Sequence, residues 1–130
     1  MNDTYFLKIE VDLPVQMKLI DSILDVEHDG EENGAWILSM DYDEVFGDLP
    51  IYYISNFVGL LKGKYGELEK IGIKRDKISV WRCVYGAGEV FMEYWPEEME
   101  MLAKEGLHFR IMVCQEENEP LNPFLPHFDC

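Results

Sequence analysis

The sequence predicts an α+β fold with a single five-stranded, mixed or antiparallel sheet and helices packed on one face. Two observations lead to this fold class. Segments with the two-residue hydrophobic alternation of strands are interspersed with segments of helical spacing, in the order β-α-β-α-β-β-α-β. The alternation is cleanest in the first and last strands, which indicates a sheet with one face under helices and one face less covered. The 130 residues are expected to form one domain over residues 1–114, followed by a Pro-rich C-terminal tail at 115–130.

The first half of the chain is predicted to contain a strand, a helix and a second strand. The first strand covers residues 5–11, where the odd-numbered positions are apolar. Asp12 is the expected N-cap of a helix that continues to about Val26. The acidic stretch at 27–33 is expected to be a solvated loop, and residues 35–40 form the second strand.

The second half begins with the longest predicted helix, which follows Pro50 and ends at Gly72. Because three glycines lie inside it, we expect a bend or break near Gly63. Two strands, at 78–85 and 89–94, are predicted to form a hairpin around the glycine-rich residues 86–88. Pro96 begins the last helix, Gly106 ends it, and a final strand covers 107–114.

The net charge of the chain indicates which classes of partner it repels and which it attracts. Twenty-six Asp and Glu residues face eleven Lys and Arg residues, for a formal net charge of −15, and seven of the eleven cations lie between Lys62 and Arg82. A field of this sign repels nucleic acid and anionic membranes and attracts cationic surfaces, although an acid excess also serves solubility. We therefore predict a basic protein partner, no nucleic acid and no membrane. The predicted acidic contact residues are Asp25, Glu27, Asp29, Glu31, Glu32, Asp41, Asp43 and Glu44.

The expected location is the cytoplasm. The N-terminus lacks the basic start and apolar stretch of a secretory signal. The three cysteines are an odd number and widely spaced, which favours reduced thiols. No run of about 18 apolar residues supports a transmembrane helix.

Motifs for catalysis or cofactor binding are absent from the sequence, which contains no G-x-S-x-G, H-E-x-x-H, G-x-G-x-x-G or P-loop. Residues 25–30 resemble the opening of a calcium loop, but its twelfth position is Trp36 instead of an acid. The histidines and cysteines lack the tight pairs of structural zinc sites. We therefore predict no cofactor, no metal and no catalytic residue.

The less covered sheet face is a second candidate site. Aromatic residues beside charged ones are enriched at protein interfaces. By alternation, Phe6 and Lys8 of the first strand share a face, and so do residues of the last strand. The predicted sheet-face site consists of Trp81, Tyr85, Glu93, His108 and Arg110. Because neither face of the strand at 78–85 is purely apolar, Arg82 is an alternative to Trp81 and Tyr85 on this face.

Residues 70–73, 78–81, 92–98 and 107–114 resemble a group of small, acidic, uncharacterised bacterial proteins that share a domain of unknown function. Members near toxin loci have been suspected of immunity roles. The resemblance covers about the C-terminal half, and the chain departs from the group's pattern at residues 88–91, where polar residues are replaced by Gly-Glu-Val-Phe. It implies a bacterial cytoplasmic setting and no established catalysis.

Three functions follow from these observations. The first is a non-enzymatic acidic binding protein of the bacterial cytoplasm, immunity- or inhibitor-like toward a basic protein such as a nuclease toxin. The second is a small-molecule-binding regulatory module with a pocket between the sheet and the long helix, lined by Tyr52, Tyr53 and the tryptophans. The third is an enzyme built around Cys114 or clustered carboxylates. The oligomeric state stays open.

Overall fold

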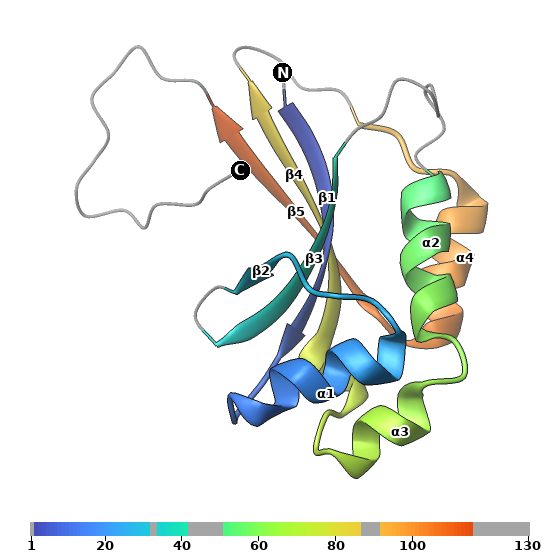
Figure 1. Cartoon of the computed structure of the whole chain (residues 1–130). Helices are drawn as coiled ribbons and strands as arrows, with labels where there is room; N and C mark the ends of the chain where they lie inside the picture. The colour runs from blue at the N-terminus through green and yellow to red at the C-terminus, as the bar shows by residue number, and fades with distance from the viewer. Residues whose placement is uncertain (1, 32–33, 42–50, 87–91, 116–130) are drawn as a thin grey trace.

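A five-stranded mixed sheet with the strand order β2-β3-β1-β4-β5 lies at the centre of the protein (Figure 1). The computed structural model describes residues 2–31, 34–41, 51–86 and 92–115. The strands are β1 (Asn2–Glu10), β2 (Gly30–Glu31), β3 (Ala35–Asp41), β4 (Ile78–Gly86) and β5 (His108–Gln115). The helices are α1 (Val15–Leu24), α2 (Ile51–Leu61), α3 (Tyr65–Lys70) and α4 (Pro96–Glu105), with a short 3₁₀ helix, η2 (Arg75–Lys77). The predicted fold class is confirmed.

β1 is the central strand and pairs antiparallel with β3 on one side and β4 on the other. β2 pairs antiparallel with β3, and β5 pairs parallel with β4 through a crossover that contains α4. Both edges of β4 are therefore occupied along its length, from Ser79 opposite His108 to Gly86 opposite Gln115.

The predicted hairpin strand at 89–94 is wrong where the structure describes it. Residues 92–94 have no strand conformation, whereas residues 89–91 lie outside the described residues. A hairpin strand would need a free edge of β4, and β1 and β5 take both. The fifth strand is instead β2, which lies in the stretch expected to be a loop.

The helices begin and end close to the predicted positions, with one correction. The break near Gly63 is confirmed: α2 ends at Leu61, α3 begins at Tyr65, and Gly63 between them has a φ of +80°. The predicted N-cap Asp12 does not cap α1, whose N-cap is Pro14. The buried Gln16 side chain instead satisfies backbone donors just before the helix. Its Oε1 accepts hydrogen bonds from the backbone N–H groups of Asp12 (2.8 Å) and Leu13 (2.9 Å).

The four described helices pack on one face of the sheet, and no described helix covers the other face, which we call the open face. Figure 1 shows α2 and α4 side by side along this face, with α1 and α3 near the end where β1 stops. The odd-numbered residues of β1 point into the core, and the even-numbered ones point to the open face, as predicted. The core joins sheet residues to all four helices: Tyr5, Leu7, Ile9, Trp36, Ile78 and Val80 pack with Ile20, Phe57, Leu61, Leu68 and Leu102. Among the described residues, no helix is long and apolar enough to span a membrane.

Candidate functional site

Four exposed carboxylates follow one another between the end of α1 and the end of β2. They are Asp25, Glu27, Asp29 and Glu31, and we call them the acidic edge. Of the other predicted acidic contacts, Asp41 is the last residue of β3, whereas Glu32, Asp43 and Glu44 lie outside the described residues. The structure therefore places the first half of the predicted set in the connection from the end of α1 to the edge strand β2.

The backbone of the acidic edge is held by the neighbouring strand. The N–H of Asp29 donates to the carbonyl of Ile37 (2.9 Å), and the Asp29 carboxylate accepts the N–H of Ser39 (2.8 Å). β2 then pairs with β3, with Glu31 opposite Trp36. Asp25 ends α1 in a left-handed conformation with a φ of 55°. The carboxylates are thus displayed from an ordered backbone, which lowers the entropic cost of binding a partner.

A polar network fixes the middle of the acidic edge to α1. The Asp21 carboxylate accepts hydrogen bonds from the Trp36 indole (2.7 Å) and from the His28 backbone (3.0 Å), and it lies 2.8 Å from His28 Nδ1. His28 Nε2 lies 3.2 Å from a Glu31 carboxylate oxygen. Both nitrogens of the ring therefore face acceptors, an arrangement that favours the protonated imidazolium.

The same contacts shift both pKa values in this network. The hydrogen bond with Asp21 raises the pKa of His28; partial burial opposes it, and Glu31 adds to the rise. Burial by itself would raise the pKa of Asp21, but the hydrogen bonds from His28 and Trp36 outweigh it and hold that pKa below its usual value. The sequence interpretation treated this stretch as a solvated loop and missed the network, because Asp21, His28 and Trp36 carry no spacing signal that joins them.

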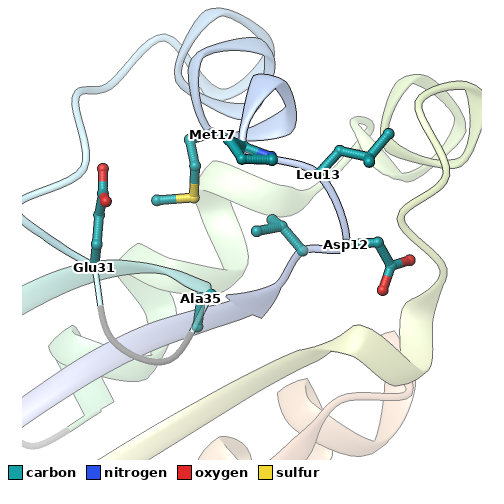
Figure 2. A pocket seen from close by; sticks show the side chains of 8 residues that line it. Asp12, Leu13, Met17, Glu31 and Ala35 are labelled. Atoms are coloured by element: carbon teal, nitrogen blue, oxygen red, sulfur yellow. The ribbon is translucent and has the colours of Figure 1, made fainter.

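A pocket opens beside the acidic edge, where β1 passes into α1 and faces the start of β3 (Figure 2). Its volume is about 340 Å³. Buried Met17 and Ala35 form its apolar floor, and its remaining lining residues are Val11, Asp12, Leu13, Pro14, Glu31 and Gly34. Figure 2 shows the carboxylates of Asp12 and Glu31 on opposite sides of the pocket, with Met17 and Ala35 between them. The sequence did not reveal this pocket, because its walls come from segments that are distant along the chain.

The open sheet face carries a row of stacked side chains across three strands. Arg110 of β5 lies opposite Trp81 of β4, which lies opposite Phe6 of β1. The Trp81 and Phe6 rings are stacked at 5.5 Å, and the charged groups of Lys8 (5.3 Å) and Arg110 (5.4 Å) lie over the indole. Cations over a tryptophan ring are attracted by its electron-rich face.

The predicted sheet-face site is only partly assembled by the fold. Trp81, Tyr85, His108 and Arg110 lie on the open face. Alternation had placed His108 and Arg110 on one face but had left open whether Trp81 and Tyr85 or Arg82 join them. Glu93 does not join them, because it lies in the irregular segment that leads into α4. The assignment of Glu93 to this face was wrong, since it assumed that residues 89–94 form a strand. A binding role for the remaining four residues stays a prediction.

A second polar network, which the sequence interpretation missed, lies on the helix-covered face. The Arg82 guanidinium forms a bidentate pair with Asp3, with Nη2–Oδ2 at 2.6 Å and Nε–Oδ1 at 2.9 Å, and donates to the Tyr94 hydroxyl at 3.1 Å. Burial alone would lower the pKa of Arg82, but these hydrogen bonds raise it. Burial raises the pKa of the Tyr5 hydroxyl, although the nearby Arg82 opposes the rise.

Glu98 is the most deeply buried carboxylate among the described residues. One of its oxygens accepts the N–H of Trp95 (3.3 Å) at the start of α4, whereas the other is buried without a hydrogen-bond partner in the described part of the chain. Burial raises the pKa of Glu98 above its ordinary value, although Trp95 and the nearby Arg82 oppose the rise.

The residues named for a small-molecule pocket under the long helix lie in different places. Tyr53 is buried and stacks on Tyr5 with ring centroids 4.6 Å apart, on the helix-covered face. Trp36 is bound to Asp21, Trp81 lies on the opposite face of the sheet, and Trp95 is exposed. Since Tyr53 and Trp81 are on opposite faces, Tyr53 and the tryptophans do not line one pocket; the side chain of Tyr52 lies outside the described part of the structure.

The thiols differ in part from the prediction of reduced cysteines. Cys83 is buried and is not in a disulfide, but Cys114 is disulfide-bonded, so the prediction is wrong for Cys114. A thiolate nucleophile at Cys114 is therefore not supported. Within the described residues, no group of three or more His, Cys, Asp or Glu side chains has the arrangement to hold a metal ion.

Comparisons of the chain with protein-family models, curated proteins and solved structures find no match. The resemblance to the acidic bacterial proteins stays a prediction from the sequence. The functional argument therefore rests on the geometry of this molecule.

Proposed function

We propose that the protein is a non-enzymatic binding protein whose acidic edge binds a basic protein partner. The observation that carries the proposal is the display of four exposed carboxylates over residues 25–31, on a backbone tied to α1 and β3, in a chain of net charge −15. A field of this sign attracts a cationic surface and speeds the encounter with it.

An inhibitor-like role fits this surface. A basic nuclease or similar protein binds its anionic substrate with a cationic surface, and an acidic protein that covers this surface would block the substrate. The resemblance in the C-terminal half to bacterial proteins suspected of immunity roles agrees with this part of the proposal. The bacterial and cytoplasmic setting is part of the same proposal.

The test is capture of basic proteins from the cells that make this protein, compared between matched variants. The variant D25N/E27Q removes two charges from the acidic edge, and Asn is tolerated at the left-handed position of residue 25. The control E69Q/E100Q removes two charges from exposed helix positions elsewhere. We expect the full chain to capture a basic protein at low salt, the edge variant to weaken this binding by about five- to tenfold, and the control to leave it nearly unchanged.

Two outcomes would count against the proposal. If no basic protein is captured at low salt, the partner class is wrong. If the two double variants weaken binding equally, the net charge acts without a specific acidic edge. Titration of the purified partner by calorimetry at two salt concentrations provides the affinities for this comparison.

A further inference from the structure

We infer that the pocket beside the acidic edge receives an arginine side chain of the basic partner. This inference rests on the proposed function and adds to it the residue that the partner must present. The pocket and the acidic edge share Glu31, so a protein bound along the edge also passes over the pocket mouth.

The lining of the pocket matches the two parts of an arginine side chain. Met17 and Ala35 provide an apolar floor, and Val11 lies beside them. Asp12 and Glu31 place carboxylates on two sides. A long basic side chain buries its methylene stem on apolar surface and keeps its charged head in a polar setting, so it fits both features.

The charges at the pocket are not compensated from within its lining. None of the eight lining residues is a Lys, Arg or His. Glu31 contacts His28 on one side but keeps a side-chain exposure of 66%, so it stays accessible to a second donor. Asp12 forms no ion pair with a described residue. An incoming cation would therefore meet two carboxylates that are available for contact.

Arginine suits this site better than lysine or an uncharged ligand. Its planar guanidinium has five N–H donors that match the geometry of a carboxylate, and it is more weakly hydrated than an ammonium group. The unbranched, polarisable side chain of Met17 adapts to an inserted stem. The volume of about 340 Å³ lies within the range of pockets that bind small ligands, and it is large enough for one side chain.

The experiment uses the full chain and three short peptides of known composition. The probes are acetyl-Gly-Arg-Gly-amide, its citrulline analogue, which replaces the guanidinium with a neutral urea, and its norleucine analogue. NMR titration follows the Met17 methyl group and the amides of Gly34 and Ala35. We expect the arginine peptide to shift these signals and the citrulline peptide to bind at least about fivefold more weakly, as expected for the loss of one exposed charge interaction.

Two variants locate the binding. D12N/E31Q removes the pocket carboxylates and should lower the affinity for the arginine peptide by about fivefold or more. The control E69Q/E100Q should leave this affinity unchanged. A35L fills the floor of the pocket and should abolish the NMR shifts caused by the arginine peptide. Thermal melting checks that A35L is folded. If A35L does not fold, D12N/E31Q tests whether the peptide binds in the pocket. Equal binding of the arginine and norleucine peptides would overturn the inference in favour of an apolar ligand. Shifts confined to residues outside the pocket would also overturn it.

The failure of this inference is distinguishable from that of the proposed function. If a basic partner loses affinity with D25N/E27Q but not with D12N/E31Q, the acidic edge binds the partner and the pocket does not take its arginine. If the arginine peptide shifts the pocket signals while no basic protein is captured, the proposed function fails although the pocket recognises a guanidinium group.

Discussion

The Arg82 and His28 networks join a cation to a carboxylate in similar surroundings, but they differ in the chemistry of the cation. The side chains of Arg82 and Asp3 are 13% and 15% exposed, and those of His28 and Asp21 are 18% and 19% exposed. Arg82 stays charged at every physiological pH, whereas the histidine titrates in that range. Burial is therefore not what separates the two networks.

The two networks also differ in what they connect. Arg82 and Asp3 are 79 residues apart in sequence and join β4 to β1, and Tyr94 brings in the segment before α4. His28 and Asp21 are 7 residues apart and hold the acidic edge to α1. The first network stabilises the global fold throughout the physiological pH range, and the second stabilises a local segment in a pH-dependent manner. The segment that carries the proposed binding surface is thus held to α1 by contacts whose strength depends on pH.

The largest expected effect comes from breaking the Arg82 network. Arg82→Met leaves the Asp3 carboxylate without its cation in a mostly buried position, and we expect the free energy of unfolding to fall by about 3 kcal/mol. The loss should be nearly the same from pH 6 to pH 9, because the guanidinium does not titrate there. Urea denaturation monitored by tryptophan fluorescence measures it. A loss of less than about 1 kcal/mol would mean that the pair contributes no more than an exposed ion pair.

A smaller effect, of opposite sign, is expected at Glu98, a buried carboxylate that forms no ion pair with a described residue. Glu98→Gln keeps an acceptor for the Trp95 N–H and removes the buried charge, so we expect stabilisation by about 1 kcal/mol at pH 7. The pKa of Glu98 is raised in the folded state, so its charged form destabilises the fold above that pKa, and this cost disappears as the pH falls to the unfolded value. The difference between variant and wild type should therefore vanish near pH 4. A difference that is constant with pH would show that Glu98 is not the titrating group.

His28→Gln tests the adjustable network. The folded pKa of His28 is raised, so its contribution is fully present below its unfolded pKa of about 6.5 and is lost as the pH rises through the folded pKa. The pKa of Asp21 is lowered, so its contribution is present above its unfolded pKa and is lost only as the pH falls through the folded pKa. We expect His28→Gln to cost about 1 kcal/mol near pH 6 and clearly less once the pH exceeds the folded pKa of His28.

The readout that separates the two networks is local. Hydrogen exchange of the Ser39 and Ile37 amides should speed up in wild type as the pH rises above the folded pKa of His28, after correction for the intrinsic exchange rate. Arg82→Met should leave this pH dependence in place, because it does not touch the acidic edge. If the cost of His28→Gln stays constant from pH 6 through the folded pKa of His28, as titrated by NMR, the network is not pH-dependent.

The smallest expected effect is on the open face. Arg110 is exposed and lies 5.4 Å from the Trp81 ring, so Arg110→Ala should reduce stability by at most about 0.5–1 kcal/mol. Thermal unfolding compared with the control Lys104→Ala, an exposed cation on α4, measures this difference. A loss close to that of Arg82→Met would mean that the row on the open face contributes as much as the covered network.

Much of the fold could be predicted because it follows from local patterns. The two-residue alternation of β1 and β5 placed their side chains on the correct faces, since successive residues of a strand point to opposite sides. The break between α2 and α3 followed from Gly63, whose positive φ favours glycine. The acidic character of residues 25–31 followed directly from their composition.

The failures concern contacts that composition does not specify. The strand expected at 89–94 had plausible local propensity, but β5 occupies the edge it would need. Asp12 was predicted to be an N-cap, but its own backbone N–H donates to the Gln16 side chain. The Gln16 amide also donates to the carbonyl of Ile71 at 2.7 Å, a contact with a residue far along the chain. Glu93 was placed on the open face only because a strand was assumed around it.

The sequence by itself determined the α+β class, the alternation of buried and open faces, the break at Gly63 and the strong negative charge. These properties depend on periodicities and side chains that are near each other along the chain. Only the tertiary structure decided that Asp3 meets Arg82, that His28 links Asp21 to Glu31, and that a pocket forms between Met17 and Ala35. Such contacts depend on which strand edges pair and which helix faces meet. Many residues with suitable chemistry compete for each contact, and the packing of the whole chain selects among them.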